Sequence, residues 1–165
     1  MARHAAPRLG LRNVVARPAD RTTRAATDVA KDEPPECGAP QADSLDDGLV
    51  VIRPGETICI AATAQGDAVT LTRVVPTNDG PARPIVFRSW REGSGVVLAI
   101  YNPFSRSLKY RAGVVLPGEV QPRDTSSCPV AGDYRQTRGH WPLPVDEILL
   151  TDFRLLPEGA ALTCE

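Results

Sequence analysis

Proline and glycine recur about every ten residues from Pro54 onward, and this spacing limits the fold more than any other feature of the chain. The 165 residues include 13 glycines and 16 prolines. Both residue types interrupt helices, and the short segments between them suit strands joined by turns. This spacing predicts an all-β domain. Because no helical pattern lies between the segments, a parallel sheet with crossover helices is not expected.

Apolar residues recur in these segments with the period of a strand. In residues 107–115, Leu108 and Tyr110 share one face and Lys109 lies on the other. Residues 95–102 form a nearly continuous apolar run, which is typical of a central strand covered on both faces. About seven strands are predicted, and they favour an immunoglobulin-like antiparallel β-sandwich. The other predicted strands lie at 67–75, 84–90, 145–156 and within 48–62, where two strands flank a turn.

The four cysteines are dispersed along the chain and include no C-x-x-C pair. Structural zinc sites take paired ligands at short spacing, so no metal site is predicted. An even number of dispersed cysteines is typical of disulfides, which form outside the cytoplasm. Four reduced, buried thiols are the alternative. We expect each cysteine to bridge to its nearest partner in sequence, which gives Cys37–Cys59 and Cys128–Cys164.

Residues 1–36 are predicted to form a disordered basic arm, and residues 37–165 the β-sandwich domain. Residues 1–31 carry seven arginines and lysines against two aspartates, although the whole chain has a formal net charge of −1. An arm that touches nucleic acid or anionic lipid is one interpretation. We favour an unstructured leader, because no aromatic residue alternates with the arginines as nucleic-acid binding would require.

The compartment is predicted from the cysteines rather than from a targeting signal. The longest apolar run of the arm, residues 14–16, is too short for the core of a secretory signal peptide. The arginine-rich start resembles an organellar transit peptide, and a start site that omits a signal peptide is the other interpretation. Apolar stretches reach five or six residues, so no transmembrane segment is predicted. We expect a periplasmic or secreted protein.

A long, irregular connection at 116–145 holds the residues that acyl-transfer chemistry would use. Ser127 or Cys128 would be the nucleophile and His140 the base. No G-x-S-x-G turn is present, and Pro129 removes the amide that would follow Cys128 into an oxyanion hole. The sequence therefore assigns no catalytic residue, and a small hydrolase remains as an alternative function.

Trp90, His140 and Trp141 are the candidate binding residues. Tryptophan rings combine apolar area with a polar edge, so a carbohydrate-binding module built on Trp90 or Trp141 is the second alternative. The competing interpretation buries Trp141 against the sandwich and lets His140 satisfy a backbone group. Phosphate-binding and dinucleotide glycine patterns are absent from the sequence, and no cofactor is predicted.

Four segments resemble an uncharacterised group of small bacterial extracytoplasmic β proteins: YNPFSRSLKYRAGVV at 101–115, TSSCPV at 125–130, HWPLP at 140–144 and ILLTDFRL at 148–155. The resemblance covers about a third of the chain. It implies an immunoglobulin-like sandwich and export, and it carries no catalytic role. We therefore expect a non-enzymatic extracytoplasmic interaction or structural module, with another protein or a glycan as partner and no nucleic acid.

Overall fold

The computed structural model describes residues 33–80 and 83–165, and all the regular structure in them is β-strand. The residues of the predicted arm up to position 32 lie outside the described residues. Each strand runs antiparallel to its neighbours. The ten strands are β1 (Leu45–Asp46), β2 (Leu49–Ile52), β3 (Thr57–Gln65), β4 (Ala68–Val75), β5 (Ile85–Glu92), β6 (Gly95–Tyr101), β7 (Leu108–Val115), β8 (Arg123–Thr125), β9 (Gln136–Trp141) and β10 (Glu147–Leu155).

The strand count within the described residues exceeds the predicted seven by β1, β8 and β9. β1 and β8 span two and three residues, which is too short to show a periodic pattern. β9 lies within residues 116–145, which were predicted to form a long, irregular connection. Its outer residues are polar, so no apolar alternation marks it.

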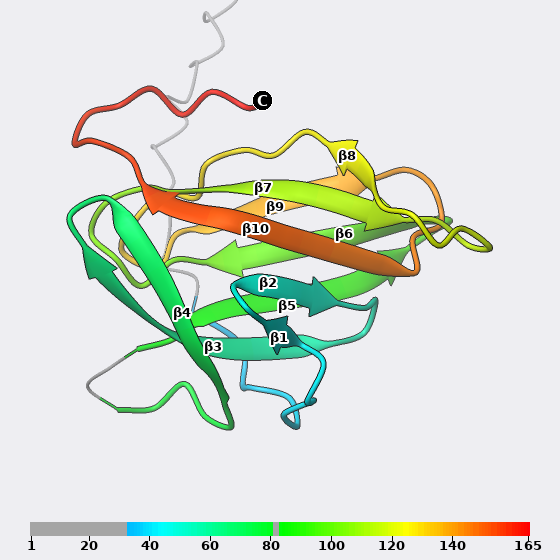
Figure 1. Cartoon of the computed structure of the whole chain (residues 1–165), viewed down its shortest axis with the longest axis horizontal. Helices are drawn as coiled ribbons and strands as arrows, with labels where there is room; N and C mark the ends of the chain where they lie inside the picture. The colour runs from blue at the N-terminus through cyan, green and yellow to red at the C-terminus, as the bar shows by residue number, and fades with distance from the viewer. Residues whose placement is uncertain (1–32, 81–82) are drawn as a thin grey trace, which may run out of the picture.

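The strands form two layers that pack face to face (Figure 1). One layer has the order β1-β2-β10-β7-β8, and the other has the order β4-β3-β5-β6-β9. The layers meet along one side, where Arg154 of β10 pairs with Ala68 of β4. Between them, Phe87 of β5 meets Phe153 of β10 edge to face, with ring centroids 6.0 Å apart. The main core therefore lies between the two layers, with β10 and β7 on one side and β5 and β6 on the other.

The two strands with the clearest sequence pattern occupy the positions that the pattern predicted. Leu108 and Tyr110 of β7 point into the core and are 0% and 6% exposed. Lys109 points the other way and forms an ion pair with Glu165. Every residue of β6 is buried, as expected for a strand covered on both faces. The alternation of apolar and polar residues in β7 therefore predicted correctly which face of the strand is buried.

Both predicted disulfides, Cys37–Cys59 and Cys128–Cys164, are present, and no cysteine is free. Two bridges fit an oxidising compartment. None of the described residues forms a helix long and apolar enough to cross a membrane.

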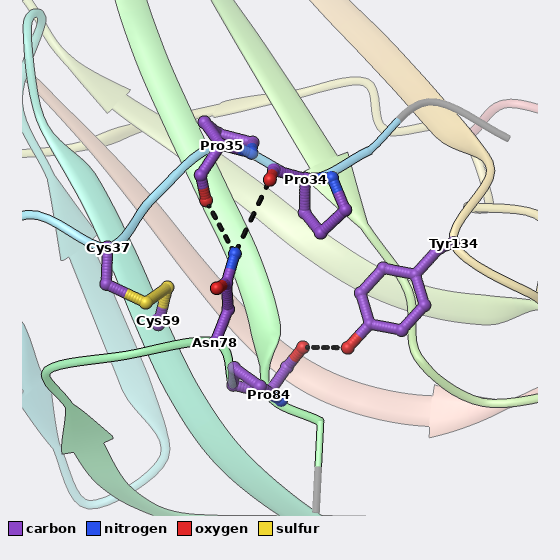
Figure 2. The surroundings of a disulfide bond; sticks show 7 residues. All are labelled: Pro34, Pro35, Cys37, Cys59, Asn78, Pro84 and Tyr134. Carbon is purple, nitrogen blue, oxygen red and sulfur yellow. Dashed lines mark hydrogen bonds between the residues drawn. A yellow bond between two sulfur atoms is a disulfide. The ribbon is translucent and has the colours of Figure 1, made fainter. Parts of the chain in front are cut away.

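The first described residues are hydrogen-bonded to the rest of the fold (Figure 2). The side-chain amide of Asn78 donates to the carbonyls of Pro34 and Pro35, at 3.4 and 2.9 Å. The Gly38 amide donates to the carbonyl of Thr57 at 2.8 Å, beside the first disulfide. The predicted boundary at residue 36 thus falls inside a segment that is already bound to the loop between β4 and β5.

A fully buried asparagine organises the loop after β6. The Asn102 side-chain amide donates to the carbonyls of Arg106 and Val130, at 2.8 and 3.1 Å. Its carbonyl oxygen Oδ1 accepts from the Phe104 amide at 3.0 Å, and its backbone carbonyl accepts from the Tyr134 amide at 2.8 Å. Buried polar groups need such partners, so Asn102 ties the loop after β6 to residues 130–134, just before β9.

Candidate functional site

The structure does not bring the predicted hydrolase residues together. The hydroxyl of Ser127 is buried and donates to the backbone carbonyl of Tyr110 at 2.8 Å. Cys128 is bridged to Cys164, so it offers no thiolate. His140 lies on β9 in the other layer, with no described hydrogen bond to Ser127. The Cys128 sulfur and the Ser127 hydroxyl therefore have structural partners, and the His140 imidazole belongs to a strand of the other layer.

The two tryptophans lie on opposite faces of one layer. Trp141 points into the core, is 9% exposed, and donates from Nε1 to the hydroxyl of Thr125 on β8 at 2.9 Å. Trp90 packs against a second apolar cluster on the outside of the layer. Trp141 therefore joins the two layers, and of the two rings only Trp90 belongs to an outer surface.

The register of β5, β6 and β9 places the functional candidates in two rows on this outer surface. Trp90 lies opposite Val97, which lies opposite His140. In the adjacent row, Arg88 and Arg138 lie on either side of Ala99. Residues directly opposite one another in antiparallel strands project from the same face. We call the surface formed by Arg88, Trp90, Val97, Ala99, Arg138 and His140 the outer sheet face.

Two arginines converge on the ring of Trp90. The guanidinium carbons of Arg88 and Arg138 lie 5.5 and 5.7 Å from the ring centroid, within the range of cation–π contacts. Both side chains are exposed, and neither forms an ion pair with a carboxylate of the described residues. Arg138 does donate a hydrogen bond to the Gln136 side chain at 3.2 Å. The indole thus contacts two positive charges without neutralising them.

These side chains line a depression of about 370 Å³ on the outer sheet face. At its floor, the amide of Gln136 donates to the hydroxyl of Tyr101 at 3.2 Å. The site offers cations, an aromatic ring and amide and hydroxyl groups, which are the kinds of group that can bind an anion and orient its neighbours. The lining residues are Glu33, Arg88, Trp90, Tyr101, Gln136 and Arg138.

A third arginine–aromatic contact lies next to this depression and has a structural role. Arg83 lies 4.5 Å above the ring of Tyr134, whose hydroxyl donates to the carbonyl of Pro84 at 2.9 Å (Figure 2). Burial raises the pKa of Tyr134 to about 12, and the charge of Arg83 opposes that rise. The tyrosine is neutral at physiological pH and anchors the start of β5.

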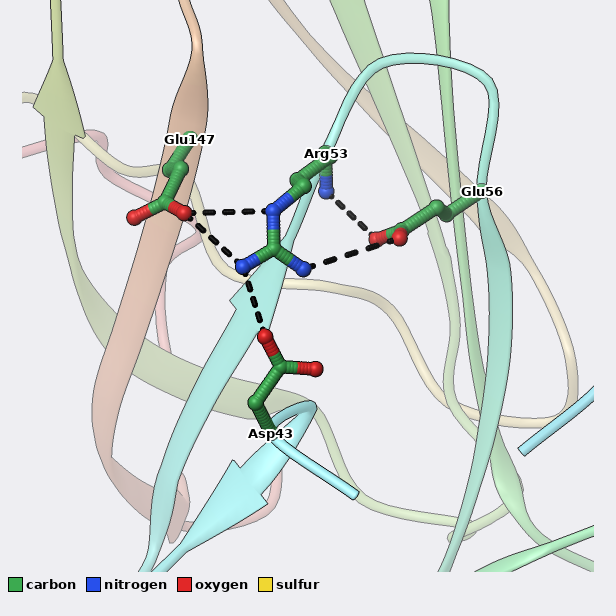
Figure 3. A network of polar contacts seen from close by, with 4 residues as sticks. All are labelled: Asp43, Arg53, Glu56 and Glu147. Atoms are coloured by element: carbon green, nitrogen blue, oxygen red, sulfur yellow. Dashed lines mark hydrogen bonds and ion pairs between the residues drawn. The ribbon is translucent and has the colours of Figure 1, made fainter. Parts of the chain in front are cut away.

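Arg53 is the centre of the other polar cluster, and its partners already satisfy it (Figure 3). Its guanidinium donates to Glu147 of β10 at 2.9 and 3.1 Å and to Asp43 at 2.7 Å. A longer ion pair of 3.8 Å joins it to Glu56, which also caps the turn after β2. The hydrogen bond from Arg53 holds the pKa of Asp43 below its usual range. This network ties three segments together and leaves no cation free for a ligand.

The described residues contain no group of three or more histidine, cysteine, aspartate or glutamate side chains arranged to hold a metal ion. The sequence named Trp90, His140 and Trp141 as candidates, and it did not point to Arg88 or Arg138, which contact the Trp90 ring. Arg88 could have been found, because it lies two residues before Trp90 and shares its strand face. Arg138 could not, because its position depends on the register across β6.

No family model, curated protein or solved structure matches this chain at a significant level. The geometry of the outer sheet face is therefore the basis for assigning a function.

Proposed function

We propose that the protein is a non-enzymatic extracytoplasmic binding module that holds an acidic glycan on the outer sheet face. One observation carries the proposal: the guanidinium groups of Arg88 and Arg138 both contact the Trp90 ring, and neither has a carboxylate partner among the described residues. A planar guanidinium group can donate two parallel hydrogen bonds, so arginines beside an aromatic ring suit the carboxylate or sulfate of a sugar.

The charge balance of the domain supports an anionic ligand at this place. Residues 33–165 carry 12 basic and 17 acidic side chains, so the domain as a whole repels anions. Two unneutralised arginines held together in such a domain favour an anion locally and fix where it binds. Glu33 at the rim adds one acidic group, which limits the site to ligands that present their charge toward the arginines.

A glycan fits the other groups of the depression better than a single small anion does. Sugar rings present an apolar face and a rim of hydroxyls, and Trp90, Tyr101 and Gln136 supply the matching aromatic surface, hydroxyl and amide. The ligand would lie along the two rows of the outer sheet face, with its charged group on the arginines. His140 lies at the far end of the Trp90 row, where it can contact a second sugar.

The setting that we propose for this module is the bacterial periplasm or the exterior of the cell. The two disulfides and the resemblance of residues 101–115 to exported bacterial β proteins support this location. We interpret the two facing layers as an immunoglobulin-like sandwich, a scaffold that commonly carries binding surfaces. Ser127 and Cys128 have structural partners, which favours binding over hydrolysis.

Calorimetric titration with a pair of matched sugars tests the proposal. The probes are a uronate hexasaccharide and the neutral hexasaccharide obtained by reducing its carboxylates. The protein should bind the acidic sugar, and salt should weaken that binding. Arg88→Gln and Arg138→Gln should each weaken it roughly tenfold or more, because a hydrogen bond to a charged group contributes about 1.5–3 kcal/mol.

Arg154→Gln is the matched control, because Arg154 is an exposed arginine on β10 in the other layer. It should bind the acidic sugar as the unmodified protein does. Arg88→Lys keeps the charge but loses the fork, and an affinity between those of wild type and Arg88→Gln is expected. Equal binding of the two sugars, or equal losses from Arg154→Gln and Arg88→Gln, would refute the proposal.

A further inference from the structure

One edge of β4 has no strand partner over most of its length. β4 pairs along one side with β3, from Ala68 opposite Gln65 to Val75 opposite Cys59. On its other side, Ala68 alone pairs, with Arg154 of β10. From Val69 to Val75 this second edge has no backbone hydrogen bond to any other part of the described chain. It presents a row of amide and carbonyl groups, which is a template for another strand.

The open edge borders a broad groove lined by residues of β1, β4 and β10. Figure 1 shows β4 splaying away from β1 and β2, and the groove between them has a volume of about 1030 Å³. β10 forms its end at Thr151–Phe153, where the pairing with β7 shifts its register and Asp152 has a φ of 56°. This irregularity lies just before Arg154, the one residue of β10 that pairs with β4.

The groove suits an extended chain with alternating apolar residues. Val69, Leu71 and Val74 of β4 and Leu45 of β1 are partly buried and pack against the core along its walls. β4 has eight residues and contains no proline, so its sequence does little to protect the edge. The outer strands β1 and β8 have two and three residues, and β9 is largely polar, so they offer poorer templates.

The charge at the rim selects the kind of chain that would bind there. Asp46 at the end of β1 and Asp47 in the turn that follows line the groove, and neither forms an ion pair within the described residues. Asp152 lies across from them and is paired with Arg111 at 3.7 Å. Arg73 is the one basic residue among those that line the groove. The rim therefore carries a net negative charge at the β1–β2 turn, which complements a basic segment.

We propose that the open edge of β4 binds an extended basic peptide of a partner protein by strand addition. The peptide would pair its backbone with Val69–Val75 and place alternate apolar side chains in the groove. Its lysine or arginine would lie against Asp46 and Asp47. This site shares no lining residue with the outer sheet face, so the module would join a glycan to a protein.

Fluorescence anisotropy with labelled nine-residue peptides tests this proposal on the full chain. The parent peptide alternates valine and threonine and ends in two lysines, and a matched peptide ends in two glutamates. The lysine peptide should bind at least about tenfold more tightly. Two further lysine peptides carry backbone N-methyl groups, one at the odd and one at the even positions. Because a strand pairs through alternate residues, one of them should bind like the parent and the other about tenfold more weakly.

Asp46→Asn with Asp47→Asn should weaken binding of the lysine peptide about threefold or more. The matched control is Asp133→Asn with Asp146→Asn, since Asp133 is an exposed aspartate with a positive φ like that of Asp47. The control should bind as the unmodified chain does. Equal binding of both N-methylated peptides, indifference to the lysine–glutamate exchange, or failure of the lysine peptide to bind would overturn the proposal. So would a dimer in sedimentation that the peptide does not dissociate, because it would assign the edge to a second copy.

Discussion

Replacing Cys128 by serine removes the bridge that holds the C-terminal tail to the segment between β8 and β9. The tail keeps other partners there: the amide of Ser127 donates to the carbonyl of Glu165 at 2.7 Å, and the reverse hydrogen bond is 3.0 Å. Lys109 also pairs with Glu165. Because these contacts can persist without the sulfur bridge, the substitution should act chiefly by freeing the unfolded chain.

The size of the effect follows from the loop that the bridge closes. Cys128 and Cys164 are 36 residues apart, and closing a loop of that length contributes about 3.8 kcal/mol in the chain-entropy treatment. With an unfolding entropy of about 2.1 cal/mol/K per residue over roughly 130 residues, the melting temperature should fall by about 14 °C. The bridge between Cys37 and Cys59 closes 22 residues and should contribute slightly less, about 3.4 kcal/mol.

Urea unfolding of the wild type, Cys128→Ser, Cys164→Ser and the double mutant measures this contribution. Both single mutants should lose the same free energy of unfolding, and the double mutant should add less than about 0.5 kcal/mol, since each change removes the same bridge. A double mutant that loses the sum of the two single effects would show that the sulfurs act separately. A loss below about 1 kcal/mol in every mutant would refute the loop-closure argument.

Three further predictions follow from the core and its tyrosines. Leu108→Ala should lower the free energy of unfolding, measured with urea, by about 2–5 kcal/mol. Lys109→Ala should lower it by a small fraction of that amount, and reversed magnitudes would mean that the register of β7 is slipped by one residue. Trp141→Phe should cost about 1–3 kcal/mol, because a buried hydrogen bond is lost; Trp90→Phe should cost less, and equal losses would contradict the assignment of the two rings. Burial raises the pKa of Tyr110 to about 12, and that of Tyr134 also rises to about 12. The unfolded state ionises first, so the free energy of unfolding should fall as pH rises from 10 to 12; phenolate absorbance appearing near pH 10 in the folded protein from all three tyrosines would contradict this.

Sequence alone predicted the strands in which one face or both faces are apolar. On β7, Leu108 and Tyr110 alternate with Lys109 because one face meets the core and the other meets solvent and the tail. β6 is apolar throughout because a second cluster covers its outer side. The disulfide pairing followed from nearness in sequence, and the fold places each pair accordingly.

The rest depended on contacts that no local pattern encodes. β9 carries Gln136, Arg138 and His140 on its outer face, so its sequence alone resembles that of a loop. Its strand conformation depends on the pairing with β6. The binding face likewise needs the register that sets Arg138 beside Trp90 across β6. The open edge of β4 depends on the tertiary arrangement, which brings only Arg154 of β10 to its free side, and the sequence does not mark this.

The indole N–H signals of the two tryptophans test the central claim most directly, that the outer sheet face is the binding surface. The chain has two tryptophans, and a nitrogen–proton correlation spectrum separates Trp90 from Trp141 once Trp90→Phe has assigned them. On titration with the uronate hexasaccharide, the Trp90 signal should move and the Trp141 signal should stay in place, because Trp141 lies in the core. A Trp90 signal that does not move at saturating sugar would contradict the account.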